Sequence, residues 1–235
     1  MNEFDDRART WDADPLRREL TEAVARAIRA RVPLDRSMHV FEYGCGTGLL
    51  SFALHEYAGA MTLADSSAGM LQVCAENIAA AGIACMHTRI LDLTVDPPPD
   101  TPVDLLCTQM ALHHVRDTDT LLRAFARMVR PGGYLCIADL EREDGSFHGP
   151  EFDGHHGFDP AALAAQVAAA GFTDCVTHTC YVLRRERQGR MRAYPVFLLS
   201  ATRAGTSTDQ HPLAVQRHGT AWRAARARRS APNLR

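Results

Sequence analysis

The 235-residue sequence predicts an α/β fold in which a mostly parallel sheet is covered by helices on both faces. Two observations lead to this prediction. Short apolar runs typical of buried strands alternate with helix-length segments over most of the chain. One such run, at 38–43, leads into a glycine-rich turn at 44–48 and then into an apolar segment that can begin a helix. This order is typical of the unit that opens a parallel sheet.

The predicted elements follow in order along the chain. An amphipathic helix over 15–32 comes first, with Pro15 near its first turn, where a missing amide hydrogen costs little. The strand at 38–43 and the glycine-rich turn follow. Beyond them, the periodicity predicts a helix at 48–57, a strand at 60–65, a helix at 67–81, strands at 84–88 and 103–109, a helix at 118–130, a turn at 131–133 and a strand at 134–139.

The last third of the sequence departs from this alternation. A helix is expected within 158–172, capped by Asp159. Two strand-like runs follow at 174–183 and 193–201, and the polar segment 184–191 separates them. So short a link favours an antiparallel hairpin at the edge of the sheet.

The glycine-rich turn carries the first functional signal. Gly44, Gly46 and Gly48 stand at alternate positions, as expected where φ is positive or where no Cβ can separate the backbone from a ligand. An ordinary tight turn is the alternative interpretation. A dinucleotide fingerprint would need a glycine where Leu49 stands, which disfavours a pyrophosphate ligand. Asp65 ends the next predicted strand, where a carboxylate can accept hydrogen bonds from two ribose hydroxyls.

These motifs resemble those of the class I S-adenosylmethionine-dependent methyltransferases. In that family the first motif reads acid-x-Gly-x-Gly-x-Gly and the second strand ends in a ribose-binding acid. The resemblance spans roughly residues 35–202 and looks closest to members that methylate small molecules. It implies a Rossmann-like, doubly wound, seven-stranded sheet with an antiparallel C-terminal hairpin. Further matching motifs are SSAGML after Asp65, RILDL at 89–93, CTQMALHHVRD at 107–117 and MVRPGGYLCIAD at 128–139.

The resemblance also implies a cofactor and its ligands. S-adenosyl-L-methionine would bind and leave as S-adenosyl-L-homocysteine, with its methionine half at the glycine turn, its ribose at Asp65 and its adenine near Met70. Met70 as core filler and Asp92 as a turn residue are the alternatives for two of these positions. The implied cofactor-binding residues are Glu42, Gly44, Cys45, Gly46, Gly48, Asp65, Ser66, Met70, Asp92, Leu93 and Gln109.

Histidines supply the candidates for catalysis. In-line methyl transfer needs a positioned acceptor and, where the acceptor is protonated, a nearby base, for which histidine has a suitable pKa. We expect this base to be His155 or His156, which lie in a glycine-flanked loop, or else His113 after the fourth strand. Each has a structural role as its alternative. His114 and His148 complete the set. These five histidines together with Asp153 could alternatively hold a metal, although their spacing fits no compact metal motif.

Composition fits one enzyme domain with two flanking segments. Hydrophobic residues make up 46% of the chain and charged residues 23%, and all 26 basic residues are arginine. Residues 1–34 are expected to form a lid and a helix, 35–204 the methyltransferase domain, and 205–235 a disordered basic tail. Seven cysteines without paired spacing, no membrane span and no secretory signal together predict a cytoplasmic protein.

The sequence leaves three functions open. The favoured one is methyl transfer to oxygen, nitrogen or sulfur of a small-molecule acceptor. The second is a non-catalytic subunit that binds the cofactor, which would have a plugged acceptor pocket. The third is methylation of a macromolecule, which the acidic body and the lack of a nucleic-acid recognition module disfavour. The sequence does not indicate an oligomeric state.

Overall fold

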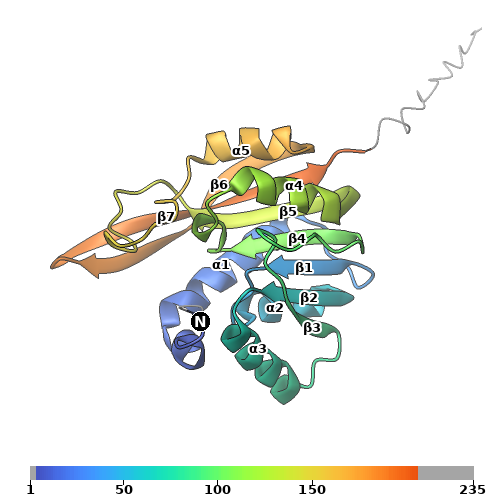
Figure 1. Ribbon diagram of the computed structural model, residues 1–235, viewed down its shortest axis with the longest axis horizontal. Helices are drawn as coiled ribbons and strands as arrows, with labels where there is room; N and C mark the ends of the chain where they lie inside the picture. Colours follow the sequence, from blue (N-terminus) through green and yellow to red (C-terminus); the bar gives the residue numbers. More distant parts are fainter. Residues whose placement is uncertain (1–3, 206–235) are drawn as a thin grey trace, which may run out of the picture. The chain divides into compact units, whose positions relative to one another are not determined.

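The computed structural model describes residues 4–205, and these contain a seven-stranded sheet with helices on both faces (Figure 1). The strand order is β3-β2-β1-β4-β5-β7-β6. Five strands run parallel, whereas β7 is antiparallel to both β5 and β6. This confirms the predicted Rossmann-like sheet with its antiparallel hairpin. The strands are His39–Tyr43 (β1), Ala60–Asp65 (β2), Met86–Ile90 (β3), Val103–Gln109 (β4), Val129–Leu140 (β5), Phe172–Arg187 (β6) and Arg190–Arg203 (β7).

Four of the five α-helices in residues 4–205 begin at residues whose side chains accept hydrogen bonds from the first turn. Asp14, Ser67, Asp117 and Asp159 each cap one α-helix in this way, and Pro15 and Pro160 follow two of these caps. The α-helices are Pro15–Arg31 (α1), Leu49–Leu54 (α2), Ala68–Ala81 (α3), Thr118–Met128 (α4) and Pro160–Ala169 (α5), with short 3₁₀ helices at Ala8–Ala13 (η1), His55–Tyr57 (η2) and Leu112–His114 (η3).

Two apolar cores hold the helices against the sheet. Alternate side chains of each strand point to opposite faces. Val40 and Leu105 therefore lie in the core beneath α1 and α2, whereas Phe41 and Leu106 lie in the core beneath α4 and α5. In Figure 1, α4 and α5 accordingly lie on one side of the sheet, and α1 and α2 on the other.

The structure differs from the sequence-based boundaries mainly at the hairpin. The polar segment 184–191 is not a separate link, because β6 and β7 pair through it up to Arg187 and Arg190. Only Gln188 and Gly189, both with positive φ, form the turn. The long polar side chains of this segment point into solvent or toward the site described below, so the sequence lacked the apolar alternation that marks a strand.

The carboxyl edge of the parallel strands gathers the residues that the sequence singled out. Strands β1, β2 and β4 end there at Tyr43, Asp65 and Gln109. The N-terminal segment Phe4–Asp14 is fastened to the same edge, since Thr47 donates a hydrogen bond to Asp12 at 2.6 Å. The tail that was expected to be disordered lies, from residue 206 onward, outside the described residues. Within residues 4–205, no helix is long and apolar enough to cross a membrane.

Candidate functional site

A cavity of about 1030 Å³ lies at this edge of the sheet. Parallel α/β sheets bind their ligands at the carboxyl ends of their strands, so its position is the expected one. Most of the predicted site residues line it: Glu42, Gly44, Cys45, Gly46, Asp65, Ser66, Met70, Asp92, Gln109 and His113. Gly48, Leu93, His155 and His156 are not among the lining residues.

The glycine turn is shaped by close backbone approaches. All three glycines have positive φ, at 69°, 54° and 91° in chain order. A Cβ on Gly44 would lie 2.4 Å from the Cβ of Ala111, and a Cβ on Gly48 would lie 2.9 Å from the Cys74 Sγ. At Gly46 the nearest atoms to such a Cβ, on Trp11 and Met70, would lie 3.8 and 3.9 Å away, which is an ordinary van der Waals distance. Gly44 and Gly48 therefore serve packing, and Gly46 leaves room for a ligand.

Asp65 connects the ends of the first two strands. One carboxylate oxygen accepts a hydrogen bond from the Gly46 amide, and the other accepts one from the Ser67 amide, both at 2.8 Å. Burial raises the pKa of this carboxyl, and the amide hydrogen bonds oppose that rise by favouring the charged form. The carboxylate is thus fixed beside the glycine turn, as ribose recognition would require.

Glu42 is the most perturbed acid of the cavity wall. Its side chain is 2% exposed, and one carboxyl oxygen accepts hydrogen bonds from the Ser51 amide at 3.0 Å and from the Ser51 hydroxyl. Desolvation outweighs these bonds and raises the pKa of Glu42 to about 8. A buried acid held partly neutral at pH 7 is prepared to ionise when a cation binds beside it.

Gln109 and Asp92, two further residues expected to bind the cofactor, are held by hydrogen bonds to neighbouring side chains and backbone. The Gln109 amide nitrogen donates to the Thr21 hydroxyl at 2.9 Å, and its carbonyl oxygen is buried without a hydrogen-bond partner among the described residues. A buried acceptor without a partner costs free energy and calls for a donor. Asp92 accepts from the Thr94 amide and hydroxyl at 2.9 and 2.6 Å, so it is a turn residue that also lines the cavity.

The N-terminal segment closes over the cofactor side of the cavity. Asp5 accepts hydrogen bonds from the Ser67 hydroxyl at 2.6 Å and from the Gly69 amide at 3.0 Å, at the first turn of α3. Phe4 and Trp11 contact each other edge to face and line the cavity. These contacts hold the N-terminal segment, which was expected to act as a lid, in a defined position beside the glycine turn.

Histidines from distant segments meet at the other end of the cavity. His113 is 1% exposed, and its Nδ1 lies 2.6 Å from a carboxylate oxygen of Asp139, which is itself fully buried. Its Nε2 lies 3.0 Å from the Nε2 of His148. With its Nδ1–H donating to the Asp139 carboxylate, the His113 ring presents Nε2 to His148 as a hydrogen-bond acceptor. Asp139, His113 and His148 thus form a chain, here called the Asp-His-His chain, that leads from the core to the cavity.

His114 and His148 are neutral at neutral pH. Burial, together with the neighbouring imidazoles, lowers the pKa of His114 to about 3 and that of His148 to about 4. The ligand atoms of His113, His114 and His148 also lie within 4.8 Å of one another, a spacing from which a transition metal could recruit them.

His155 and His156 lie away from this cluster. The His155 ring contacts the backbone carbonyls of Val115 and Arg116, at 3.1 and 3.2 Å. His156 lies 3.5 Å from Glu143. Gly154, beside them, has no room for a Cβ against the His113 carbonyl, at 2.4 Å. Neither imidazole is among the residues that line the cavity, and the expectation that one of them is the base stays a prediction.

Sequence reasoning missed several residues of the site. Asp139 ends a buried strand, which is a detectable signal for a carboxylate at the carboxyl edge of the sheet. Arg17 and Arg185, by contrast, come from a helix and from an edge strand that read as ordinary solvated surface. Both line the cavity, and only the tertiary structure brings them there.

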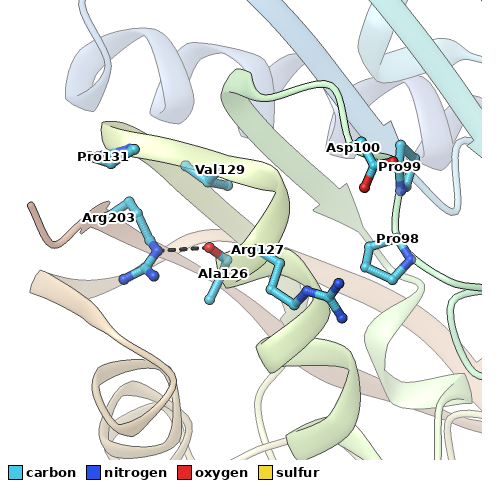
Figure 2. A pocket seen from close by; sticks show the side chains of 8 residues that line it. All are labelled: Pro98, Pro99, Asp100, Ala126, Arg127, Val129, Pro131 and Arg203. Atoms are coloured by element: carbon cyan, nitrogen blue, oxygen red, sulfur yellow. Dashed lines mark hydrogen bonds between the residues drawn. The ribbon is translucent and has the colours of Figure 1, made fainter. Parts of the chain in front are cut away.

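A second cavity lies at the opposite edge of the sheet and is no candidate for the site. Figure 2 shows its lining, which includes the prolines of the 98–100 loop and the first residues of β5; its volume is about 320 Å³. Arg203 is occupied there, since its Nε donates to the Ala126 carbonyl at 2.7 Å. This cavity has neither a histidine nor a glycine turn in its wall.

Comparisons with known proteins agree with this geometry. Residues 41–137 match the protein family described as "Methyltransferase domain". An uncharacterized methyltransferase of Schizosaccharomyces pombe is 31% identical over 48% of this chain and 42% of its own length. A ubiquinone biosynthesis O-methyltransferase of Caulobacter vibrioides is 29% identical over 52% of this chain and 49% of its own. The chain thus spans about half the length of these curated relatives.

Solved structures share the fold. The protein DhpI in complex with SAH superposes with a TM-score of 0.66 at 23% identity, over 86% of this chain and 93% of its own. A putative methyltransferase of Haloferax volcanii in complex with Trm112 gives 0.67 at 19% identity, over 87% and 99%. The motif order, the sheet topology and the methyltransferase domain matched over residues 41–137 agree, and together they indicate a class I S-adenosylmethionine-dependent methyltransferase.

Proposed function

We propose that this chain transfers a methyl group from S-adenosylmethionine to oxygen, nitrogen or sulfur of a small-molecule acceptor. The observation that carries the proposal is one continuous cavity of about 1030 Å³, lined by the glycine turn and Asp65 and also by His113 and His148 of the Asp-His-His chain. Pockets for a single drug-sized ligand measure about 300 to 1,000 Å³, so this volume suits the cofactor together with a small acceptor.

The residues present fit the cofactor. Asp65 offers a fixed acceptor for the ribose, and the open backbone at Gly46 leaves space beside it. Glu42 and the buried carbonyl oxygen of Gln109 are acceptors suited to the methionine ammonium. Met70, 2% exposed, would pack on the adenine. When bound, S-adenosylmethionine supplies an electrophilic methyl group, and its sulfur keeps the electron pair of the carbon–sulfur bond that breaks.

The Asp-His-His chain would remove the acceptor proton. His148 lines the cavity and is neutral at neutral pH, so it can accept a proton as the acceptor's lone pair forms the new bond to carbon. The Nε2 of His113, 3.0 Å away, can then receive a proton from His148. Asp139 stabilises the resulting imidazolium through the contact at 2.6 Å. The base role thus moves from His155 and His156 to His148, backed by His113.

The open cavity disfavours a non-catalytic cofactor-binding subunit, which would be expected to have a plugged acceptor side. A macromolecular acceptor also has little support, because the N-terminal segment closes over the cofactor side. The Haloferax volcanii relative is seen with an activator protein. A comparable partner would add a surface to this fold without changing the chemistry proposed here.

The experiment is methyl transfer from labelled S-adenosylmethionine into fractionated metabolite pools, with the full-length chain. His148→Gln and His113→Gln should each lower turnover by about 10² to 10⁴, while S-adenosylhomocysteine binds as it does to the parent. His87→Gln, on the exposed edge strand β3, is the matched control.

Four outcomes would contradict the proposal in whole or in part. Full activity in His113→Gln would remove the Asp-His-His chain from the mechanism, and loss of activity only in His155→Gln or His156→Gln would restore the sequence-based candidates. Intact cofactor binding with no labelled product from any pool would favour the non-catalytic subunit. If added chelator abolishes turnover and a divalent metal restores it, the three imidazoles act as metal ligands instead of as a base.

A further inference from the structure

Arginines from several segments gather in the wall of the cavity. Arg7 comes from the N-terminal segment, Arg17 from α1, and Arg185 and Arg187 from β6. We call these four residues the arginine cluster. They come from three segments that are distant in sequence, so the cluster is a product of the tertiary fold.

The cluster carries more positive charge than its protein partners neutralise. Arg17 and Arg185 share one carboxylate, Asp14, at 3.8 and 3.7 Å. These distances exceed those of a good charge-assisted hydrogen bond. Asp14 is also engaged as the cap of α1, where it accepts from the Leu16 amide at 3.0 Å. The Nε of Arg17 is buried without a hydrogen-bond partner among the described residues.

Both guanidinium groups are held against aromatic rings. Arg17 lies 3.5 Å from the centre of the Trp11 ring, and Arg185 lies 4.7 Å from that of Phe147. Stacking fixes a guanidinium and leaves its edge free to pair with a planar anion. Burial lowers the pKa of each arginine, and each also repels the other. Removing such charges from water without full pairing is costly, and a bound anion would offset that cost.

Arg187 has a different role in the cluster. Its Nε and one terminal nitrogen donate to the Ser146 and Phe147 carbonyls, at 3.1 and 2.8 Å. It therefore fixes the backbone immediately before His148. Arg185, two residues away on the same face of β6, stacks on Phe147, which itself contacts the His148 ring edge to face at 4.9 Å. An anion on Arg185 would lie close to the base proposed above.

The cofactor carboxylate can satisfy only part of this charge. Arg17 and Thr21 share one face of α1, and Thr21 contacts Gln109 at the expected methionine end. Arg17 is therefore the arginine best placed for the cofactor. Arg185 comes from β6 and adjoins Phe147 and His148, on the acceptor side.

We propose, on the basis of the proposed function, that the methyl acceptor is an anion whose carboxylate or phosphate group binds Arg185, with Arg17 beside it. Such a contact would fix the distance between the charged group of the acceptor and the atom that faces His148. Neutral and cationic acceptors would leave these guanidinium groups unpaired and would be selected against.

The first test measures binding and does not depend on turnover. Benzoate, phenyl phosphate and benzyl alcohol are titrated calorimetrically into the full-length chain saturated with S-adenosylhomocysteine. We expect at least one anion to bind ten times or more tightly than benzyl alcohol, and the tighter anion distinguishes carboxylate from phosphate. Arg185→Met should weaken that binding at least tenfold. Arg184→Met is the matched control, because Arg184 is exposed and does not line the cavity.

The inference is overturned if no anion binds, if benzyl alcohol binds equally well, or if Arg185→Met binds like the parent. A second test divides the metabolite pool by anion exchange before methyl transfer. Labelled product from the retained fraction supports the inference. Product only from the unretained fraction rejects an anionic acceptor and leaves methyl transfer standing, whereas product from no fraction rejects the proposed function itself.

Discussion

Protonation of Glu42 should control how tightly the cofactor binds. Burial raises the pKa of this carboxyl to about 8, so at pH 7 about nine in ten free molecules carry it neutral. The methionine ammonium favours the ionised form. Cofactor binding must therefore expel the proton, and apparent affinity should rise with pH. The folded-state pKa lies above the ordinary value of 4.5, so Glu42 also costs the free chain stability as pH rises through that window toward 8.

The size of the effect follows from the ionised fraction. With a pKa of about 8, the ionised share of Glu42 rises from about 1% at pH 6 to about one half at pH 8. If only the ionised form accepts the cofactor, its apparent Kd falls about fiftyfold over this range. Binding at pH 7 should release about 0.9 proton per site by the same linkage.

Calorimetric titration of S-adenosylhomocysteine at pH 6, 7 and 8, in two buffers with different ionisation heats, measures both quantities. Glu42→Gln keeps the shape of the side chain and removes the charge, so its Kd should be nearly constant with pH and its proton release small. Because the pKa of Asp65 is raised as well, the comparison of the parent with Glu42→Gln shows how much of the pH dependence comes from Glu42 and how much from Asp65. A parent Kd that does not change with pH, or a Glu42→Gln variant that keeps the parent's slope, would refute the reasoning.

Three further changes test other contacts of the site. Asp65→Ala should weaken S-adenosylhomocysteine by about 1 to 3 kcal/mol in calorimetry, because the ribose loses a charged acceptor in a partly dry site; unchanged binding would mean that the ribose lies elsewhere. Gly44→Ala should lower both the melting temperature and cofactor affinity, because its φ is 69° and its Cβ would lie 2.4 Å from that of Ala111. Adding Ala111→Gly should restore only the part of this loss that comes from the clash between the two Cβ atoms, because the positive φ at residue 44 remains. Asp5→Ala should speed S-adenosylhomocysteine release in stopped-flow experiments, because it frees the N-terminal segment from α3; Arg9→Ala, which breaks only an exposed ion pair with Glu76, should not, and equal effects would contradict this role.

The fold could be predicted from the sequence because its signals are local. Strands β2 and β4 begin and end where the apolar runs do, at Ala60–Asp65 and Val103–Gln109. The positions of the glycine turn and Asp65 at one end of the sheet could also be predicted, since both lie in one βαβ unit. The antiparallel hairpin was predicted as well, but the pairing of its strands through 184–191 was not, because the cavity and solvent replace the core along both faces of its tip.

The contacts between the histidines show what a local sequence pattern cannot predict. His155 and His156 lie in a glycine-flanked loop, which is typical of an active-site rim, yet their rings contact the Val115 and Arg116 carbonyls and Glu143. His113 and His148 are 35 residues apart in sequence and meet at 3.0 Å. No spacing rule relates them, because their meeting depends on where β5 and the loop after it lie in the folded sheet.

The two ends of the cavity therefore differ in how their specificity is encoded. The cofactor is the same for every member of the family, so one turn and one strand end can recognise it through backbone and a single carboxylate. On the proposed function, the acceptor side is built from the loop before α5 and from β6, beside Arg7 of the N-terminal segment and Arg17 of α1. Substitution of a single arginine in β6 would change the charge of that side while the glycine turn and Asp65 stayed as they are. We infer that acceptor choice in this fold resides in the edge hairpin and the segments beside it, whose side chains reach the cavity through the tertiary fold and not through a local sequence motif.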